Sequence, residues 1–319
     1  MNRKDGKYME LLRYESPFEC SEVLKLWGEI FGSEEAVLET PQVNGAERTE
    51  NLDIVFVAKE EDQILGTIHG TIPRSMPSVC GLSAMCTTPA ARGKGLGRLL
   101  FTKIVEEMET QGVKTMFLGT GNPIAAKLYK SCGFSYLPGS KVMARFASGD
   151  LVDFQRETFL KKPKSIEIRP GSADMRIPLI PLALYWTPYL LLDCNTNLVS
   201  SEYITQFACM SLYPRYMKLV EEGGVFWQAR NEEGVLGAVA SVMPTELGMR
   251  ADFFSTEIFT PTIKDLLTCC EDHAGEIYLQ IANTDTEKIR VAAELGYSPS
   301  GTACVSYRNV NIPCTIYKK

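Results

Sequence analysis

Residues 91–100, Ala-Arg-Gly-Lys-Gly-Leu-Gly-Arg-Leu-Leu, combine residue types and a spacing that suit the binding of an anion. Glycines alternate with other residues and basic side chains lie among them: Arg92, Gly93, Lys94, Gly95, Leu96, Gly97 and Arg98. Glycines let successive backbone N–H groups turn toward one anion, and the start of the helix that follows adds the positive end of its dipole. The stretch therefore predicts a phosphate-binding loop at a helix N-terminus.

The spacing of these glycines fits neither of the two common nucleotide-binding motifs. A P-loop requires Gly-x-x-x-x-Gly-Lys-Ser/Thr, but Lys94 is followed by Gly95, and Thr88 stands where the first glycine belongs. The dinucleotide pattern Gly-x-Gly-x-x-Gly fails because Arg98 occupies the position of its third glycine. The loop is expected to hold a different phosphate ligand.

The segments around the loop predict one sheet with helices packed on it. Alternating apolar residues predict strands near 8–14, 79–87, 113–119 and 140–147, with a hairpin over 53–59 and 63–73. Helical periodicity is expected within 17–40, over 95–111 and over 123–132. Strands and helices mixed in this way indicate an α/β (α+β) domain.

A second motif follows the strand expected at 113–119. Residues 122–134 read Asn-Pro-Ile-Ala-Ala-Lys-Leu-Tyr-Lys-Ser-Cys-Gly-Phe. Asn122 is suited to cap a helix, Pro123 fits its first turn, and Gly133 fits its end. This sequence predicts a short helix that is capped by Asn122 and ends at Gly133.

The two motifs together resemble the Gcn5-related N-acetyltransferase (GNAT) superfamily. Its loop pattern Arg/Gln-x-x-Gly-x-Gly/Ala is matched by Arg92, Gly95 and Gly97. Its helix pattern Asn-x-x-Ala-x-x-Leu-Tyr-x-x-x-Gly-Phe is matched at Asn122, Ala125, Leu128, Tyr129, Gly133 and Phe134. The resemblance covers residues 8–147 and implies a mixed, mostly antiparallel sheet flanked by helices.

The resemblance implies direct transfer of an acetyl group from acetyl-CoA to an amine of a small molecule or peptide. The loop would bind the pyrophosphate, the strand end would pair with the pantetheine arm, and Asn122 would contact the pantetheine or the substrate. The implied cofactor-binding residues are Met85, Cys86, Thr87, Arg92, Gly93, Lys94, Gly95, Leu96, Gly97, Arg98 and Asn122. Tyr129 would act as the general acid that protonates the departing thiolate.

Structural roles remain open for several of these residues. Tyr129 shares a helical stripe with Ala125 and Cys132 and could simply be packed, while a helix cap alone accounts for Asn122. Cys86 is interpreted as a strand residue rather than a nucleophile. No general base can be assigned from the sequence, and His69, in an apolar alternation, is interpreted as structural.

The second half of the chain resembles the first. Residues 58–73 align without gaps on 229–244, at a constant offset of 171, and both segments predict a hairpin. A helix ending in Gly-aromatic follows in each half, at 122–134 and at 283–297. The pattern predicts two tandem GNAT-like domains.

The second copy lacks the features on which the chemistry depends. Ala292 stands at the position equivalent to Tyr129, and residues 253–267 contain no glycine, although the helix keeps Asn283 and its Gly-aromatic end. We expect a catalytic domain at 1–147, a linker at 148–163 and a degenerate domain at 164–319. The apolar, proline-containing stretch 177–192 is too short for a membrane span and is a candidate interface.

The composition limits the kinds of partner and the cell compartment that we expect for this protein. The net charge of −6 argues against nucleic acid as the main partner. The ten cysteines form no Cys-x-x-Cys pair and there are two histidines, so no metal is expected. The polar first residues and unpaired cysteines favour a cytoplasmic protein without membrane attachment. A homodimer, a non-catalytic acetyl-CoA-binding regulator, and an acyltransferase using another acyl-CoA or a hydroxyl acceptor remain open.

Overall fold

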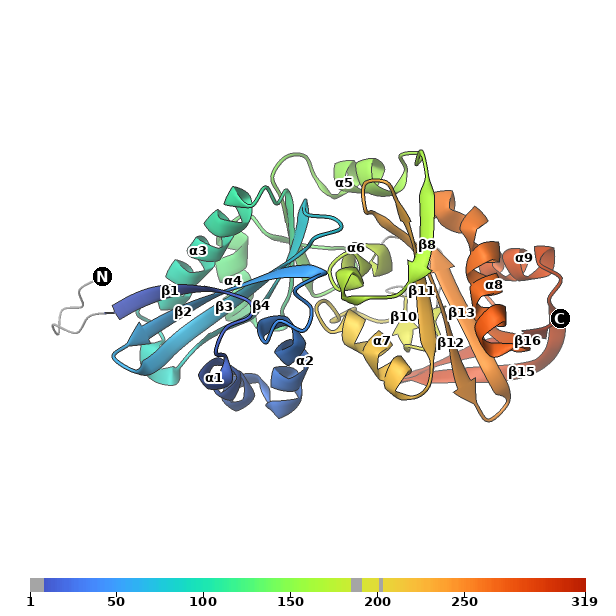
Figure 1. The fold of residues 1–319 in the computed structure, drawn as a ribbon, viewed down its shortest axis with the longest axis horizontal. Coiled ribbons are helices and arrows are strands. Elements are labelled where there is room, and N and C mark those ends of the chain that lie inside the picture. Colours follow the sequence, from blue (N-terminus) through green and yellow to red (C-terminus); the bar gives the residue numbers. More distant parts are fainter. Residues whose placement is uncertain (1–8, 185–190, 201–202) are drawn as a thin grey trace. The chain divides into compact units, whose positions relative to one another are not determined.

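The computed structural model describes residues 9–184, 191–200 and 203–319. Its contacts divide the chain into two compact units (Figure 1). The first unit comprises residues 1–136, 142–148 and 209–211. The second comprises 137–141, 149–208 and 212–319.

The first unit is built on a seven-stranded sheet of order β1-β2-β3-β4-β5-β7-β6. Its strands are β1 (Met9–Glu15), β2 (Asn51–Glu60), β3 (Gln63–Pro73), β4 (Val79–Thr87), β5 (Thr115–Gly119), β6 (Ser135–Tyr136) and β7 (Val142–Phe146). Neighbouring strands are antiparallel except β4 and β5, which run parallel. The expected strands are present, and the short β6 is the one that the sequence patterns did not indicate.

Helices cover both faces of this sheet. They are α1 (Ser21–Phe31), α2 (Ser33–Val43), α3 (Leu96–Thr110) and α4 (Pro123–Ser131). Successive side chains of β2 point to opposite faces of the sheet. Ile54 and Phe56 share a core with α3, whereas Val55 and Val57 pack with α1 on the other face. The sheet is therefore apolar on both faces.

Strands β4 and β5 separate early, which opens the sheet. Their pairing covers three residues and ends at Gly81 and Phe117, although β4 continues to Thr87. The register between β3 and β4 also shifts near Ala84, which has a positive φ of 47°. This bulge bends β4 away from its neighbour, as extra residues in a strand commonly do.

The second unit has the same sheet topology. Its order is β15-β16-β14-β13-β12-β11-β8, with β13 and β14 as the parallel pair. The strands of this sheet are β8 (Ile166–Pro170), β11 (Val225–Asn231), β12 (Leu236–Thr245), β13 (Gly248–Ser255), β14 (Ile277–Ala282), β15 (Ser298–Tyr307) and β16 (Val310–Lys318). A separate two-stranded sheet is formed by β9 (Leu191–Asp193) and β10 (Leu198–Val199). The remaining helices are α5 (Leu151–Phe159), α6 (Leu179–Ala183), α7 (Leu212–Glu221), α8 (Ile263–Ala274) and α9 (Thr286–Glu294).

Matching details link the two sheets. The hairpin β2–β3 shifts register after Ala58, and the hairpin β11–β12 shifts after Ala229, which is the aligned residue. Helices α4 and α9 have the same length and begin 163 positions apart, at Pro123 and Thr286. The predicted fold class, two mixed and mostly antiparallel sheets flanked by helices, is confirmed.

The expected linker, 148–163, and the candidate interface, 177–192, each contain a helix. The region 148–163 contains α5, which begins with a capping box of Asp150 and Asp153. In the stretch 177–192, residues 185–190 lie outside the described part, whereas α6 is buried and contacts α7 and β12 within the second unit. None of the helices in the described ranges is long and apolar enough to cross a membrane.

Candidate active site

A cavity of about 550 Å³ lies where β4, the glycine loop and α4 meet. Ten of the twelve predicted site residues line it: Met85, Cys86, Thr87, Arg92, Gly93, Gly95, Leu96, Gly97, Asn122 and Tyr129. Lys94 and Arg98 are not among its lining residues. The fold therefore brings the strand end, the loop and the helix to one place.

The glycine loop has a backbone that can receive an anion. Gly93 and Gly95 have positive φ values of 74° and 80°, and a Cβ at either position would meet no atom within 4 Å. Within the described part of the chain, the backbone N–H groups of residues 93–98 donate to no protein acceptor. Unpaired N–H groups at the start of α3 suit a phosphate group, because they offer donors together with the helix dipole.

The basic side chains of the loop differ in their surroundings. Arg92 is exposed and its Nε donates to the Thr87 carbonyl at 3.4 Å. Lys94 is exposed. Arg98 donates from Nη2 to the Ser131 hydroxyl at 3.2 Å and so links α3 to α4. Arg92 is thus the basic side chain nearest to the cavity wall.

Asn122 both caps α4 and lines the cavity. Its Oδ1 accepts hydrogen bonds from the backbone N–H groups of Ile124, at 2.9 Å, and Ala125, at 3.4 Å. Pro123 occupies the first turn and Gly133, with φ of 88°, follows the helix end. The capping interpretation accounts for this side chain, while its amide remains beside the cavity.

Tyr129 is both packed and directed to the cavity. Its ring centroid lies 4.7 Å from that of Phe101 on α3, and 7% of the residue is exposed. Burial raises the pKa of its hydroxyl to about 12. The phenol is therefore protonated at neutral pH, as a proton donor must be.

Cys86 has no feature of an activated nucleophile. Its Sγ lies 3.3 Å from the Thr67 hydroxyl, and burial raises the pKa of the thiol. A nucleophilic cysteine requires the opposite shift. Its placement on β4 beside the cavity agrees with its interpretation as a strand residue.

A smaller cavity of about 180 Å³ adjoins the first at the opening between β4 and β5. The two share Phe31, Met85, Asn122, Ala125 and Tyr129 as lining residues. Its other walls are mostly apolar, with Ser83 and Thr120 as hydroxyl-bearing residues. A molecule in this cavity would lie beside Tyr129 without contacting the loop.

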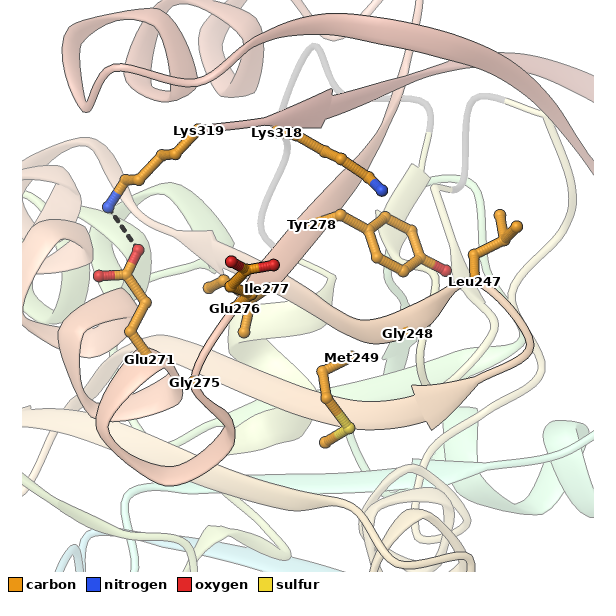
Figure 2. Close-up of a pocket in the computed structure, with 10 residues that line it drawn as sticks. All are labelled: Leu247, Gly248, Met249, Glu271, Gly275, Glu276, Ile277, Tyr278, Lys318 and Lys319. Carbon is orange, nitrogen blue, oxygen red and sulfur yellow. Dashed lines mark hydrogen bonds and ion pairs between the residues drawn. The ribbon is translucent and has the colours of Figure 1, made fainter.

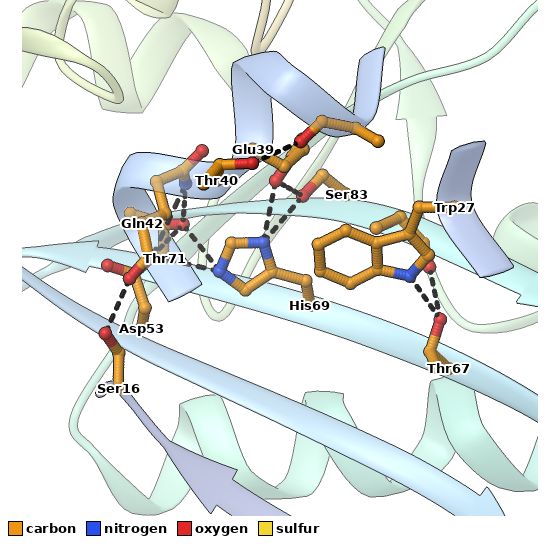
Figure 3. A network of polar contacts seen from close by, with 12 residues as sticks. Ser16, Trp27, Glu39, Thr40, Gln42, Asp53, Thr67, His69, Thr71 and Ser83 are labelled. Carbon is orange, nitrogen blue, oxygen red and sulfur yellow. Dashed lines mark hydrogen bonds and ion pairs between the residues drawn. The ribbon is translucent and has the colours of Figure 1, made fainter. Parts of the chain in front are cut away.

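A buried polar network lies on the α1–α2 face of the same sheet (Figure 3). His69 is fully buried between two carboxylates: its Nδ1 lies 2.9 Å from Glu39 Oε2 and its Nε2 lies 2.9 Å from Asp53 Oδ1. The Ser83 hydroxyl donates to the same Glu39 oxygen at 3.1 Å. Trp27 stacks on the imidazole, with ring centroids 5.9 Å apart, and donates to Thr67.

The carboxylates hold His69 in its charged form. Burial alone would lower the pKa of the imidazole, but hydrogen bonds to Asp53 and Glu39 outweigh it and raise the value to about 9. The structural interpretation of His69 fits this arrangement. The sequence did not indicate Glu39, Asp53 or Ser83, and the one available signal was a polar Asp53 within an apolar strand.

The corresponding region of the second unit is closed by its own chain. The cap of α9 is Asp285. The side chain of Asn283 accepts a hydrogen bond from the Thr315 hydroxyl. At the α9 position that matches Ala125, the buried Lys288 donates to Asp252 Oδ1 at 2.5 Å and to the Leu192 carbonyl at 2.9 Å. Asp252 is the first residue of β13 beyond its pairing with β14, so this ion pair joins α9 to β13 where the two strands separate.

The outer part of that region is also unsuited to a pyrophosphate. A groove of about 650 Å³ between the starts of α8 and α9 is lined by Glu257, Lys264, Glu287, Arg290 and Glu294, among others. Acidic groups outnumber basic ones, and Arg290 is already paired with Glu287 and Glu294. The 3-10 helix Glu257–Thr262 takes the place of a glycine loop.

Another cavity of the second unit, of about 410 Å³, lies at the other end of its parallel strands (Figure 2). Met249 and Ile277, near the starts of β13 and β14, form part of its wall. Its Glu271 is paired with Lys319 and accepts a hydrogen bond from the Tyr297 hydroxyl. The residues that line this cavity do not resemble those that line the site of the first unit.

Comparisons with known proteins agree on one family. The model of the acetyltransferase (GNAT) family matches residues 20–134. An uncharacterised N-acetyltransferase of Schizosaccharomyces pombe is 35% identical over 86 residues, or 25% of this chain, and the chain spans about half of that relative, 51% of its length.

Solved structures of the same family are also similar. A GNAT family acetyltransferase of Brucella melitensis in complex with acetyl-CoA has 18% identity and a TM-score of 0.35, covering 46% of this chain and 92% of its own. A GNAT family N-acetyltransferase of Escherichia coli in complex with CoA has 18% identity and a TM-score of 0.35. The match covers 44% of this chain and 83% of the Escherichia coli chain.

The segment matched by the family model lies within the first unit and contains both motifs. This segment of the first unit is similar to the acetyltransferase (GNAT) family.

The raised pKa of His69 predicts a loss of stability with rising pH. Its contribution is fully present below pH 6.5, the unfolded value, and is lost as pH rises through about 9, the folded value. The unfolding free energy should fall by roughly 2–3 kcal/mol between pH 6.5 and 9.5, since one pKa unit corresponds to about 1.4 kcal/mol. Denaturant unfolding at several pH values measures this slope. The His69→Gln variant should lack this component, and equal slopes in both proteins would contradict the prediction.

The Lys288 ion pair predicts a strong effect of removing one partner. Lys288→Met should destabilise the second unit by about 3–5 kcal/mol, because Asp252 then stays buried without its cation. Adding Asp252→Asn should recover part of that loss. Thermal and denaturant unfolding test both variants against Lys264→Met, which alters an exposed lysine on α8. A loss no larger than that of the control would rule out a closing role for the ion pair.

Proposed function

We propose that the first unit transfers an acetyl group from acetyl-CoA directly to an amine within a ternary complex. The observation that carries this proposal is the cavity lined by the loop backbone, the end of β4 and Tyr129, next to a second cavity at the same strand opening. One space suits a long phosphorylated thioester and the other suits its acceptor. The acetyl-CoA-bound relative of Brucella melitensis supports the choice of cosubstrate.

The loop and strand would bind the two ends of the cosubstrate. The free N–H groups of residues 93–98 would hold the pyrophosphate, with Arg92 as the nearest cation. Lys94 and Arg98 would contribute through backbone N–H groups rather than through contacts of their side chains. The backbone of Met85, Cys86 and Thr87 would pair with the pantetheine arm, and an N–H there would polarise the thioester carbonyl.

Tyr129 would act as the general acid. It lines both cavities and so stands where cosubstrate and acceptor would meet. Its raised pKa keeps the proton on the phenol until a strong base such as a departing thiolate is present. Asn122 would position the pantetheine or the acceptor from the start of α4.

We propose that the second unit is a degenerate copy without a cofactor site. The shared strand order, the aligned hairpin bulges and the equal helices α4 and α9 support a duplication. The Lys288–Asp252 pair and the absence of a glycine loop support the loss of binding. In this proposal residues 1–147 carry the catalysis and 164–319 carry the degenerate copy.

Ligand binding to the loop predicts selective stabilisation. Acetyl-CoA should raise the melting temperature of the first unit by several degrees, since about 2.7 kcal/mol is gained at a hundredfold excess over Kd. NAD and ATP should leave the melting temperature unchanged. Gly95→Glu should abolish the shift, because it places a carboxylate at the phosphate site. Differential scanning fluorimetry measures these shifts.

Gly112→Glu is the matched control for this substitution. Gly112 has φ of 85° and open space around its Cβ position, as Gly95 does, but it does not line the cavity. It should carry the same backbone strain and keep the acetyl-CoA shift. Equal shifts with all three ligands, or none with acetyl-CoA, would refute the cosubstrate assignment.

The transfer itself is tested by CoA release over a panel of amines, including aminoglycosides, polyamines and peptide N-termini. At least one amine should give turnover that depends on the loop. Binding of acetyl-CoA without release of CoA on any acceptor would favour a regulatory binding protein.

The proposed acid predicts a separation of catalysis from binding. Tyr129→Phe keeps the ring contact with Phe101 but removes the hydroxyl. It should lower kcat by about 10²–10⁴-fold, the usual range for a general acid, and leave the acetyl-CoA melting shift unchanged. Steady-state kinetics with the best amine of the panel measure this ratio. An unchanged kcat would show that Tyr129 is only a packing residue.

A further inference from the structure

The smaller cavity of the site contacts a buried polar network that the motifs do not include. Of the residues drawn in Figure 3, Ser83 also lines the cavity of about 180 Å³ beside Tyr129. Its hydroxyl donates to Glu39 Oε2 at 3.1 Å, and the Glu39 side chain is 14% exposed. Ser83 therefore connects a molecule in this cavity with the buried carboxylate.

A nucleophilic triad is the first alternative for this geometry. Ser83 Oγ lies 3.1 Å from His69 Nδ1, and His69 Nε2 lies 2.9 Å from Asp53 Oδ1. However, Glu39 Oε2 lies closer to Nδ1, at 2.9 Å, so an N–H on each side of the ring donates to a carboxylate. The ring then has no lone pair with which to activate Ser83. The histidine positions Glu39 and does not act as a base.

Two carboxylates contact the one imidazole. Glu39 comes from α2, Asp53 from β2 and His69 from β3. Asp53 Oδ2 has no hydrogen-bond partner among the described residues. Cys209, also near Glu39, stays a neutral thiol because burial raises its pKa to about 12. Carboxylates that are buried behind Ser83 favour a cation where Ser83 lines the cavity.

We propose that Glu39, reached through the Ser83 hydroxyl, accepts the proton that a cationic amine must lose before it attacks the thioester. The inference rests on the proposed acetyl transfer and names its general base and its acceptor class. Phe31, Ile68 and Leu82 in the cavity wall select an apolar group next to the ammonium. The acceptor is thus a small primary alkylammonium ion.

The proton moves in two linked transfers. The ammonium N–H bond breaks as its proton passes to Ser83 Oγ, and the original Ser83 O–H proton passes to Glu39 Oε2. The amine gains a lone pair, Ser83 keeps one proton, and Glu39 becomes a carboxylic acid. His69 remains bound to both carboxylates and holds Glu39 in place.

Two acceptors separate this role from a structural one. The first is a primary alkylamine from the CoA-release panel, and the second is its β,β,β-trifluorinated analogue, whose nitrogen is mostly uncharged at neutral pH. Glu39→Gln should lower kcat/KM for the alkylamine by about 10²–10⁴-fold. It should change the value for the fluorinated amine by less than about threefold, because no ammonium proton has to leave.

Ser83→Ala provides a second test that leaves the buried cluster complete. It should show the same selectivity between the two acceptors. Glu34→Gln, the same change at an exposed position of α2, should affect neither. The acetyl-CoA melting shift should be kept in all three variants. This shift checks folding and cosubstrate binding separately from the proton transfer.

Several results would overturn the inference. Equal losses for both acceptors would indicate a structural role, and no loss would exclude Glu39 as the base. An acetyl group found on Ser83 by mass spectrometry, after incubation with acetyl-CoA alone, would establish the nucleophilic alternative. If none of the amines in the panel makes the wild-type protein release CoA, the proposed acetyl transfer is wrong. The assignment of Glu39 as its general base then fails with it.

Discussion

The early separation of β4 from β5 is the constraint on which the first unit depends. A parallel pair normally shares hydrogen bonds along its length, but here the pairing ends after Gly81 and Phe117. The bulge at Ala84 turns the rest of β4 outward, so its backbone edge faces a cavity. The glycine loop then continues from this edge into α3, and α4 follows β5 on the other side. Cosubstrate and acceptor can therefore approach the same point from two sides of the opening.

The second unit shows what happens when the same opening is filled. Strands β13 and β14 also separate after three pairs, but β13 stays in regular register with β12 and has no bulge. Where α4 has the small Ala125, α9 has Lys288, whose ammonium reaches Asp252 across the opening. A lysine that is 4% exposed requires strong internal partners, and Asp252 and the Leu192 carbonyl supply them. At this position the first unit thus has a small residue that lines a cavity, whereas the second has a buried ion pair.

The sequence predicted the parts of the site that depend on backbone geometry. Glycine spacing, the Asn122 cap and the Gly133 end each constrain local conformation, so Arg92–Gly97 and α4 could be identified as motifs and the structure brings them together. The acidic cluster could not be found this way. Glu39, Asp53 and Ser83 come from α2, β2 and β4, and only tertiary packing places them around His69. Helix α2 follows no motif of the loop or of α4, and nothing in its residue pattern distinguishes Glu39 from Glu34.

Burying charged groups costs free energy, and this cost bears on the role of the carboxylates around His69. Replacing a buried ion pair by apolar residues is often neutral or stabilising, so stability alone gives little reason for two carboxylates around His69. In the second unit the buried ammonium of Lys288 donates to acceptors of its own chain and closes a space. In the first unit the carboxylate of Glu39 instead accepts a hydrogen bond from Ser83, which lines a cavity beside Tyr129. A buried negative charge with one polar outlet stabilises a cation at that outlet more strongly than an exposed carboxylate would, because the surrounding protein screens it less than water does. The same burial that makes the cluster costly therefore makes it suited to bind an ammonium ion and to take its proton.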